Sequence, residues 1–174
     1  FGRIRDAKLS FLTSYDADTG GHKLQDIKGN WRLYDTTLGW SDHVPPFTNL
    51  NADLSLDNAK FVANITNANV GGMSVQHGNV TISPIVGDAK RQAALSISVK
   101  GGLGKAIDHA KATGLTTVAT VDLTEVTASG EAEMILQASF PLKEKISVLK
   151  AIQKLDATIS NGSFTNLPEG IRID

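Results

Sequence analysis

LGWSDHVPPFTNLNADLSL, residues 38 to 56, joins a Pro-Pro corner to the most regular alternation in the chain. From Asn49 onward one side carries polar residues and the other carries Leu50, Ala52, Leu54 and Leu56. Alternation with a period of two is typical of a β-strand with one apolar and one polar face. Pro45 and Pro46 have no N–H group to donate, so we expect the strand to begin just after them.

Length and composition indicate one globular domain over residues 1–174. The chain is 41% hydrophobic and 20% charged, which is ordinary for a folded domain and does not predict disorder or a membrane span. Its 17 Lys and Arg against 18 Asp and Glu give a net charge of -1. This balance provides no broad positive field, so nucleic acid is not an expected partner.

Two features bear on the origin of the chain. The absence of cysteine excludes disulfides and thiolate chemistry, but it fits a reducing or an oxidising compartment equally. The chain starts at Phe1 without the basic and apolar regions of a signal peptide. We therefore expect a piece of a longer protein, with any anchor or targeting signal outside this sequence.

Similar alternation recurs along the chain and predicts a mainly β fold. Turns are expected at residues 16–21, at Asp57-Asn58 and at Gly71-Gly72. The predicted strand regions are 1–12, 29–40 (interrupted at 35–38), 49–56, 60–66, 73–82 (as short strands), 92–100, 116–123, 130–140 and 155–159. Residues 142–150 are ambiguous between a linker and a helical turn.

One helix and one weak recurrence complete the pattern. Leu103, Ala106, Ile107 and Ala110 recur at helical spacing between Gly102 and Gly114, which predicts a helix near 103–112. An Asn or Asp, two small or polar residues and an apolar residue begin at each of Asp6, Asp35, Asn58 and Asn161. We interpret these positions as turns that enter successive strands, unless the recurrence is chance.

No residue pattern predicts catalysis, a cofactor or a metal. The segment from Val99 to Ala106 resembles a phosphate-binding loop, but Val99 replaces its first glycine and Ala106 replaces its hydroxyl residue. Its glycines are better explained as the end of a strand and the start of a helix. The scattered histidines lack metal-ligand spacing and are interpreted as surface residues: His22, His43, His77 and His109. We therefore expect that the protein is not an enzyme and holds no cofactor.

The apolar face then becomes the feature to explain. Eight or nine strands at about 4.8 Å spacing make a sheet roughly 40 Å wide, whereas one helix is about 10 Å across. The sheet must therefore fold into a sandwich or closed barrel, or curl into a trough whose lining meets lipid or another apolar ligand. Periodicity alone favours the sandwich.

A family resemblance favours the trough. The order of Trp40, Pro45-Pro46 and the alternating strand to Leu56 resembles the domain of unknown function of YhdP-type proteins in the AsmA-like family. The resemblance continues through Gly71-Gly72, the helix from Leu103, and the Phe140-to-Leu142 segment to the closing strand and turn at 155–167. The four residues between Trp40 and the prolines, and the helix-like character of 142–150, depart from the family pattern.

The resemblance implies a curved antiparallel sheet with one short helix, forming a trough-like β-groove segment. Such proteins are periplasmic envelope proteins of double-membrane bacteria, anchored in the inner membrane by a part outside this sequence and implicated in phospholipid transport and outer-membrane biogenesis. The expected partners are phospholipid or another acyl-chain ligand and adjacent repeats of the same parent chain; the alternative is a closed β-sandwich acting as a structural or protein-binding module. The expected groove lining is Leu50, Leu54, Leu56, Phe61, Ile65, Leu95, Ile97, Val99, Met134, Leu136, Phe140, Leu155 and Ile159.

Overall fold

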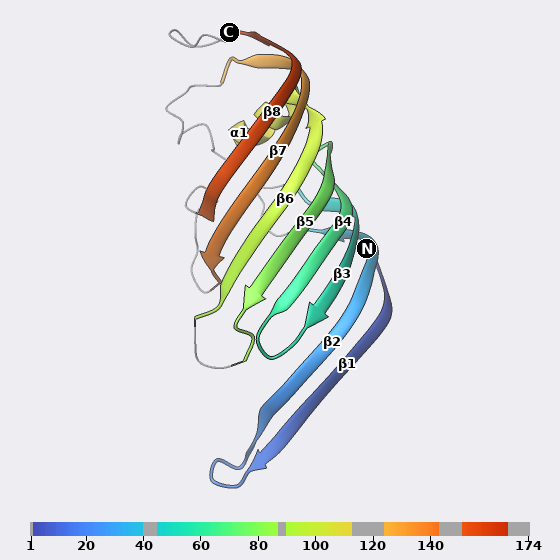
Figure 1. Cartoon of the computed structure of the whole chain (residues 1–174), viewed down its shortest axis with the longest axis vertical. Coiled ribbons are helices and arrows are strands. Elements are labelled where there is room, and N and C mark those ends of the chain that lie inside the picture. The colour runs from blue at the N-terminus through green and yellow to red at the C-terminus, as the bar shows by residue number, and fades with distance from the viewer. Residues whose placement is uncertain (1, 40–44, 87–89, 113–123, 143–150, 167–174) are drawn as a thin grey trace.

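The computed structural model describes residues 2–39, 45–86, 90–112, 124–142 and 151–166. Within these ranges the chain forms eight strands and one helix (Figure 1). The elements are β1 (Arg3–Asp16), β2 (Gly21–Leu38), β3 (Phe47–Leu56), β4 (Phe61–Val70), β5 (Met73–Ser83), β6 (Gln92–Gly102), α1 (Leu103–Ala112), β7 (Thr127–Pro141) and β8 (Ile152–Thr165). The predicted mainly β fold with one short helix is confirmed.

The strands form a single antiparallel sheet in chain order, β1 to β8. Each strand pairs with the strands before and after it, and β1 and β8 are the two edges. Figure 1 shows the sheet curving strongly, with the β1–β2 hairpin extending past the ends of the other strands. The sheet is therefore open, which agrees with the predicted curved groove and differs from two packed sheets.

Strand β3 contains the alternation that dominates the sequence. It begins at Phe47, directly after Pro46, and Leu50, Ala52 and Leu54 are all buried. The turn to β4 is closed by Asp57, whose carboxylate accepts the backbone N–H groups of Lys60 and Ala59 at 2.8 Å each. These hydrogen bonds favour the charged carboxylate, so they lower the pKa of Asp57 below its usual value.

Several strands are longer than the sequence predicts. Strand β1 continues to Asp16, and β2 starts at Gly21 rather than at residue 29. Residues 73–83 form one strand instead of several short ones. The segment from Asp35 to Leu38 does not interrupt β2 as predicted, because the chain absorbs Asp35 as a bulge and stays in the sheet.

The recurrent Asn and Asp positions are mostly bulges, so their interpretation as turns was wrong for three of the four. Asp6, Asp35 and Asn161 lie inside strands with φ between 48° and 52°, next to breaks in strand register. Asn and Asp tolerate this left-handed conformation, which a bulge requires as much as a turn does. Only Asn58 lies at a turn, between β3 and β4.

A second set of contacts joins the bulges of β2 and β3. The side-chain amide of Asn51 accepts the Asp35 N–H at 3.2 Å and donates to the Asn49 carbonyl at 3.2 Å. Asn49 is itself at φ 51°, beside a register shift between β3 and β4. Because bulges bend strands and increase their twist, neighbouring bulges of this kind favour the curvature of the sheet.

Gly130 marks the bulge shared by β7 and β8. Its φ is 111°, and a Cβ atom there would lie 2.6 Å from the Asn161 carbonyl oxygen. Only glycine combines this backbone angle with this close approach. The β7–β8 end of the sheet therefore bends at a bulge as well.

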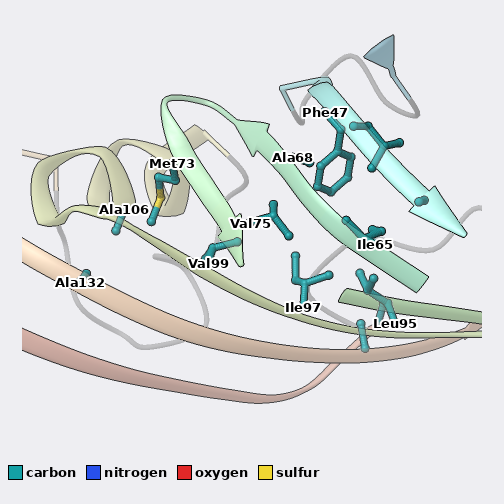
Figure 2. Packing of buried hydrophobic residues seen from close by; sticks show 14 of the residues in the cluster. Phe47, Ile65, Ala68, Met73, Val75, Leu95, Ile97, Val99, Ala106 and Ala132 are labelled. Atoms are coloured by element: carbon teal, nitrogen blue, oxygen red, sulfur yellow. The ribbon is translucent and has the colours of Figure 1, made fainter. Parts of the chain in front are cut away.

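The core lies on one face of the sheet. Figure 2 shows Phe47, Ile65, Val75 and Ile97 pointing toward the inner side of the curve from strands β3 to β6. The same cluster contains Leu103, Ala106 and Ile107 of α1, so the helix lies on this face. Helix α1 packs mainly against β7, next to the end of β6 from which it starts, and its predicted bounds near 103–112 are confirmed.

Some predictions fall outside the described residues. The predicted strand at 116–123 and most of the ambiguous segment 142–150 lie there. Trp40 and His43, at the start of the Pro-Pro corner, lie there too.

The glycines before α1 end β6 and precede the first helical residue, as predicted.

Candidate functional site

The candidate site is the apolar face of the sheet, which we define by a row of directly paired residues. The row crosses all eight strands and has one member in each. From β1 to β8 it runs Ile4, Leu33, Ala52, Ile65, Gly78, Ile97, Leu136 and Leu155. Seven of the eight are apolar side chains and the eighth is glycine, so a continuous apolar track runs perpendicular to the strands.

Solvent exposure rises along this row from its centre to both ends. Ile65 and Ile97 are only 8% and 7% exposed, whereas Ile4 is 65% and Leu155 is 49% exposed. The central strands therefore form the hydrophobic core of this chain. The two flanks carry apolar side chains that the described structure leaves in water.

All thirteen predicted lining residues lie on the apolar face, but they differ in access. Six are buried: Leu50, Leu54, Ile65, Leu95, Ile97 and Val99. Five are half-buried: Leu56, Phe61, Met134, Leu136 and Phe140. Two are exposed: Leu155 and Ile159. An apolar ligand can therefore reach Leu155 and Ile159 directly. It can reach the six buried residues only if the side chains packed around them move.

The sequence analysis missed the most exposed part of this face. Ile4, Leu9 and Phe11 of β1 are 65%, 60% and 69% exposed, and Leu24 of β2 is 37% exposed. Register places all four on the apolar face, since Leu9 pairs with Gly29 and Phe11 with Ile27. The sequence shows that Leu9 and Phe11 alternate with polar residues. It does not show on which face of the sheet they lie, because the bulge at Asp6 shifts the strand register before them.

Aromatic residues mark the boundary between the buried centre and the β1–β2 flank. Trp31 of β2 is half-buried and pairs with Leu54. Its ring lies 6.1 Å from the ring of Phe61, at an angle of 38°. Such tilted aromatic pairs stabilise packing beyond the area they bury.

The opposite face of the sheet, which we call the polar face, is held by polar side chains. Arg32 of β2 donates to Asp53 of β3 at 2.9 Å and lies 3.7 Å from the Asp6 carboxylate. A side-chain hydrogen bond with Tyr34 and the charge of Asp53 raise the pKa of Arg32. Two hollows of about 240 and 280 Å³ flank this cluster. With Arg32 paired to two carboxylates, we interpret the cluster as structural.

Ladders of amide groups continue the polar face. Asn51 donates to Asn67 at 3.1 Å, and Asn79 donates to Asn64 at 2.7 Å. Each pair joins neighbouring strands. Cross-strand pairs of this kind stabilise a sheet without offering a reactive group.

The predicted surface histidines divide into two kinds. His22 and His77 are exposed, in agreement with the prediction. His109 is half-buried, and its Nε2 lies 3.0 Å from the Gly71 carbonyl oxygen. Its interpretation as a surface residue was therefore wrong: the ring connects α1 to the β4–β5 turn.

Two further searches concern the described residues only. There, no group of three or more His, Asp or Glu side chains is placed to hold a metal ion. Within the same residues, no helix has the length and apolar character needed to span a bilayer.

Comparison of the chain with protein-family models, with curated proteins and with solved structures finds no match.

Proposed function

We propose that this chain is a segment of an intermembrane lipid-transport protein, and that the apolar face of its sheet carries phospholipid acyl chains. The observation that supports this most is the row from Ile4 to Leu155, which is apolar across every strand and exposed at both ends. Large exposed apolar surface on a folded protein commonly marks a binding site. A row that crosses the sheet suits a long, flexible, apolar ligand.

The proposed mechanism is passive. Each methylene group that moves from water onto an apolar surface gains about 0.8 kcal/mol, which holds the acyl chain. The charged head group stays in water, because burying it unpaired would cost several kcal/mol. The acyl chain can therefore move from one apolar residue to the next without a bond being broken, and no catalytic residue is needed.

The exposure gradient suggests where the contact occurs. Acyl chains would meet the β1–β2 flank and the β8 flank first, because the centre of the apolar face is buried in this structure. Strands β1 and β8 each have one edge to which no described strand pairs. In the proposed parent protein, an adjacent repeat of the same chain would pair with the β8 edge and extend the apolar track.

The proposed setting follows from the resemblance to YhdP-type, AsmA-like proteins. On that proposal the chain lies in the periplasm of a double-membrane bacterium, within a protein anchored in the inner membrane. The order of the Pro-Pro corner, β3, the Gly71-Gly72 turn, β6 and α1 supports it. Membrane contact would then be made by other parts of the parent protein.

A second candidate is a structural or protein-binding module with no lipid contact. The burial of Leu50, Ile65 and Ile97 favours it, because buried apolar residues need no ligand. It leaves the exposed side chains at both flanks without a partner. The two candidates differ in what these exposed positions do.

A matched pair of substitutions in β7 and β8 tests the proposal. Ile159 lies on the apolar face, since it pairs with Ala132, which is buried in the core cluster; Ile135 pairs with Ser98 and Asp156 and lies on the polar face. The two are similarly exposed, at 46% and 41%. The assay is transfer of a phospholipid with a fluorescently labelled acyl chain from phosphatidylcholine vesicles to the 174-residue chain.

Ile159→Asp should reduce transfer by about tenfold or more, because a carboxylate is unfavourable against hydrocarbon. Ile135→Asp should leave transfer unchanged, and circular dichroism should show both variants folded. Equal transfer by both variants, or no transfer by the unaltered chain, would favour the module without lipid contact.

A further inference from the structure

The outer edge of the sheet at β1, to which no described strand pairs, is positively charged. Arg3, Arg5 and Lys8 are exposed and pair with Tyr34, Arg32 and Asn30 of β2. This register places all three on the polar face, opposite Ile4 and Leu9. Three long cationic side chains therefore stand on one face of the edge strand, and exposed apolar side chains stand on the other.

The carboxylates of β1 have other partners. Asp6 lies 3.7 Å from Arg32, and Asp16 accepts the backbone N–H of Asp18 at 3.0 Å. Among the described residues, Arg3, Arg5 and Lys8 form no ion pair with a carboxylate within 4 Å, and the Arg5 guanidinium lies 5.2 Å from the centre of the Tyr34 ring. The edge thus keeps a surplus of positive charge.

The β8 edge differs. Its cation Lys154 lies 2.6 Å from Asp156 on the same strand, so that pair is neutral. Leu155 and Ile159 supply exposed apolar side chains there as well. The two flanks of the apolar face therefore share their apolar character but not their charge.

We propose that the β1 edge selects phospholipids with a net negative head group; this inference rests on the proposed function. The acyl chain lies on Ile4, Leu9 and Phe11, while Arg3, Arg5 and Lys8 extend around the unpaired edge to the phosphate. Long Arg and Lys side chains place their charge away from an apolar stem in this way. Guanidinium groups bind phosphate oxygens through paired hydrogen bonds, and free N–H groups of an edge strand provide further donors.

The test compares two transfers in chloride buffer. One is of acyl-labelled phosphatidylglycerol from phosphatidylglycerol vesicles, and the other is of acyl-labelled phosphatidylcholine from phosphatidylcholine vesicles. The test variant is Arg3→Gln, Arg5→Gln and Lys8→Gln together in the 174-residue chain. The matched control removes three cations elsewhere: Lys60→Gln, Lys100→Gln and Lys154→Gln. A cation near an anionic lipid surface contributes roughly fivefold in affinity, or on the order of a hundredfold for three.

The unaltered chain and the control should prefer phosphatidylglycerol, and raising the salt concentration should weaken the preference. The test variant should lose most of the preference while its transfer from phosphatidylcholine stays the same. No preference in the unaltered chain, or equal loss in both variants, would overturn the inference and leave the proposed function standing.

Two further results would also overturn the inference. Binding of inorganic phosphate to the unaltered chain that is lost in the test variant, without any preference for phosphatidylglycerol vesicles, would show a site for free phosphate instead of lipid. No transfer from either kind of vesicle would contradict the proposed function itself.

Discussion

At the scale of single residues, Asn and Asp side chains decide where strands bend and where they end. Asn58 ends β3 by imitating a peptide group: its Oδ1 accepts the Ile27 N–H at 2.7 Å, and its Nδ2 donates to the Asp26 carboxylate at 2.9 Å and the Gln25 carbonyl at 3.4 Å. These groups belong to β2, beyond its last pair with β3 at Gly29. The side chain thus takes hydrogen bonds that a longer β3 would have made.

We expect Asn58→Ala to lower the free energy of unfolding by about 1–3 kcal/mol, because it leaves partly buried groups of β2 without partners. Asn69→Ala is the control, since Asn69 is an exposed residue of β4. It should change the free energy of unfolding by less than about 0.5 kcal/mol. Urea denaturation measures both. Similar values for the two variants would show that Asn58 does not hold β2.

The sequence predicted that Asn and Asp positions are special, but not what they do. A turn and a bulge both place such a residue at positive φ. Whether the strand reverses or continues depends on its neighbour. At Asp6 and Asp35 the neighbouring strand continues to pair on both sides of the break, so the strand continues and bends.

At the scale of elements, α1 connects the end of β6 to distant parts of the sheet. Its apolar residues join the core, His109 reaches the β4–β5 turn, and the Lys111 Nζ donates to the carbonyls of Thr124 and Val126 at 3.0 Å each. Helical spacing predicted the bounds of the helix correctly. It did not predict the contact between His109 and Gly71, because residues 38 positions apart meet only through the fold.

The contact at Gly71 can be tested with a matched pair of glycines. Gly71 and Gly20 have similar φ angles, 53° and 68°, so Ala costs about 1 kcal/mol of backbone strain at each. A Cβ on Gly71 would also lie 1.8 Å from the His109 ring, whereas nothing lies within 4 Å at Gly20. Gly71→Ala should therefore lower the midpoint of thermal unfolding more than Gly20→Ala does.

Removing the ring should remove the difference. In a His109→Ala background, Gly71→Ala should cost no more than Gly20→Ala, because only backbone strain remains. An unchanged cost of Gly71→Ala in that background would place α1 away from the β4–β5 turn.

At the scale of the whole molecule, the open sheet has a buried centre and two apolar flanks. Alternation predicted most strands and the face on which their apolar residues lie. It could not decide between a sandwich and a trough, because a strand has the same alternation of apolar and polar residues in both. The answer depends on pairing between strands: β1 and β8 lie at opposite edges of one sheet and do not close it.

The candidate site was predicted in the same uneven way. Its thirteen residues share one face, as expected, but the six at its centre are core residues of this chain. The exposed residues of β1 were missed, because bulges changed their register. The burial of these side chains depends on the curvature of the whole sheet, which cannot be predicted from the sequence of any single strand.

The most direct measurement places a photoreactive amino acid at Phe11 or at Leu12 and irradiates the chain with phospholipid vesicles. These neighbours in β1 are almost equally exposed, at 69% and 62%, but Phe11 pairs with Ile27 on the apolar face and Leu12 with Asp26 on the polar face. If the apolar face carries acyl chains, mass spectrometry should find a lipid adduct at position 11 and little or none at position 12. Equal labelling at the two positions, or none at position 11, would contradict the account.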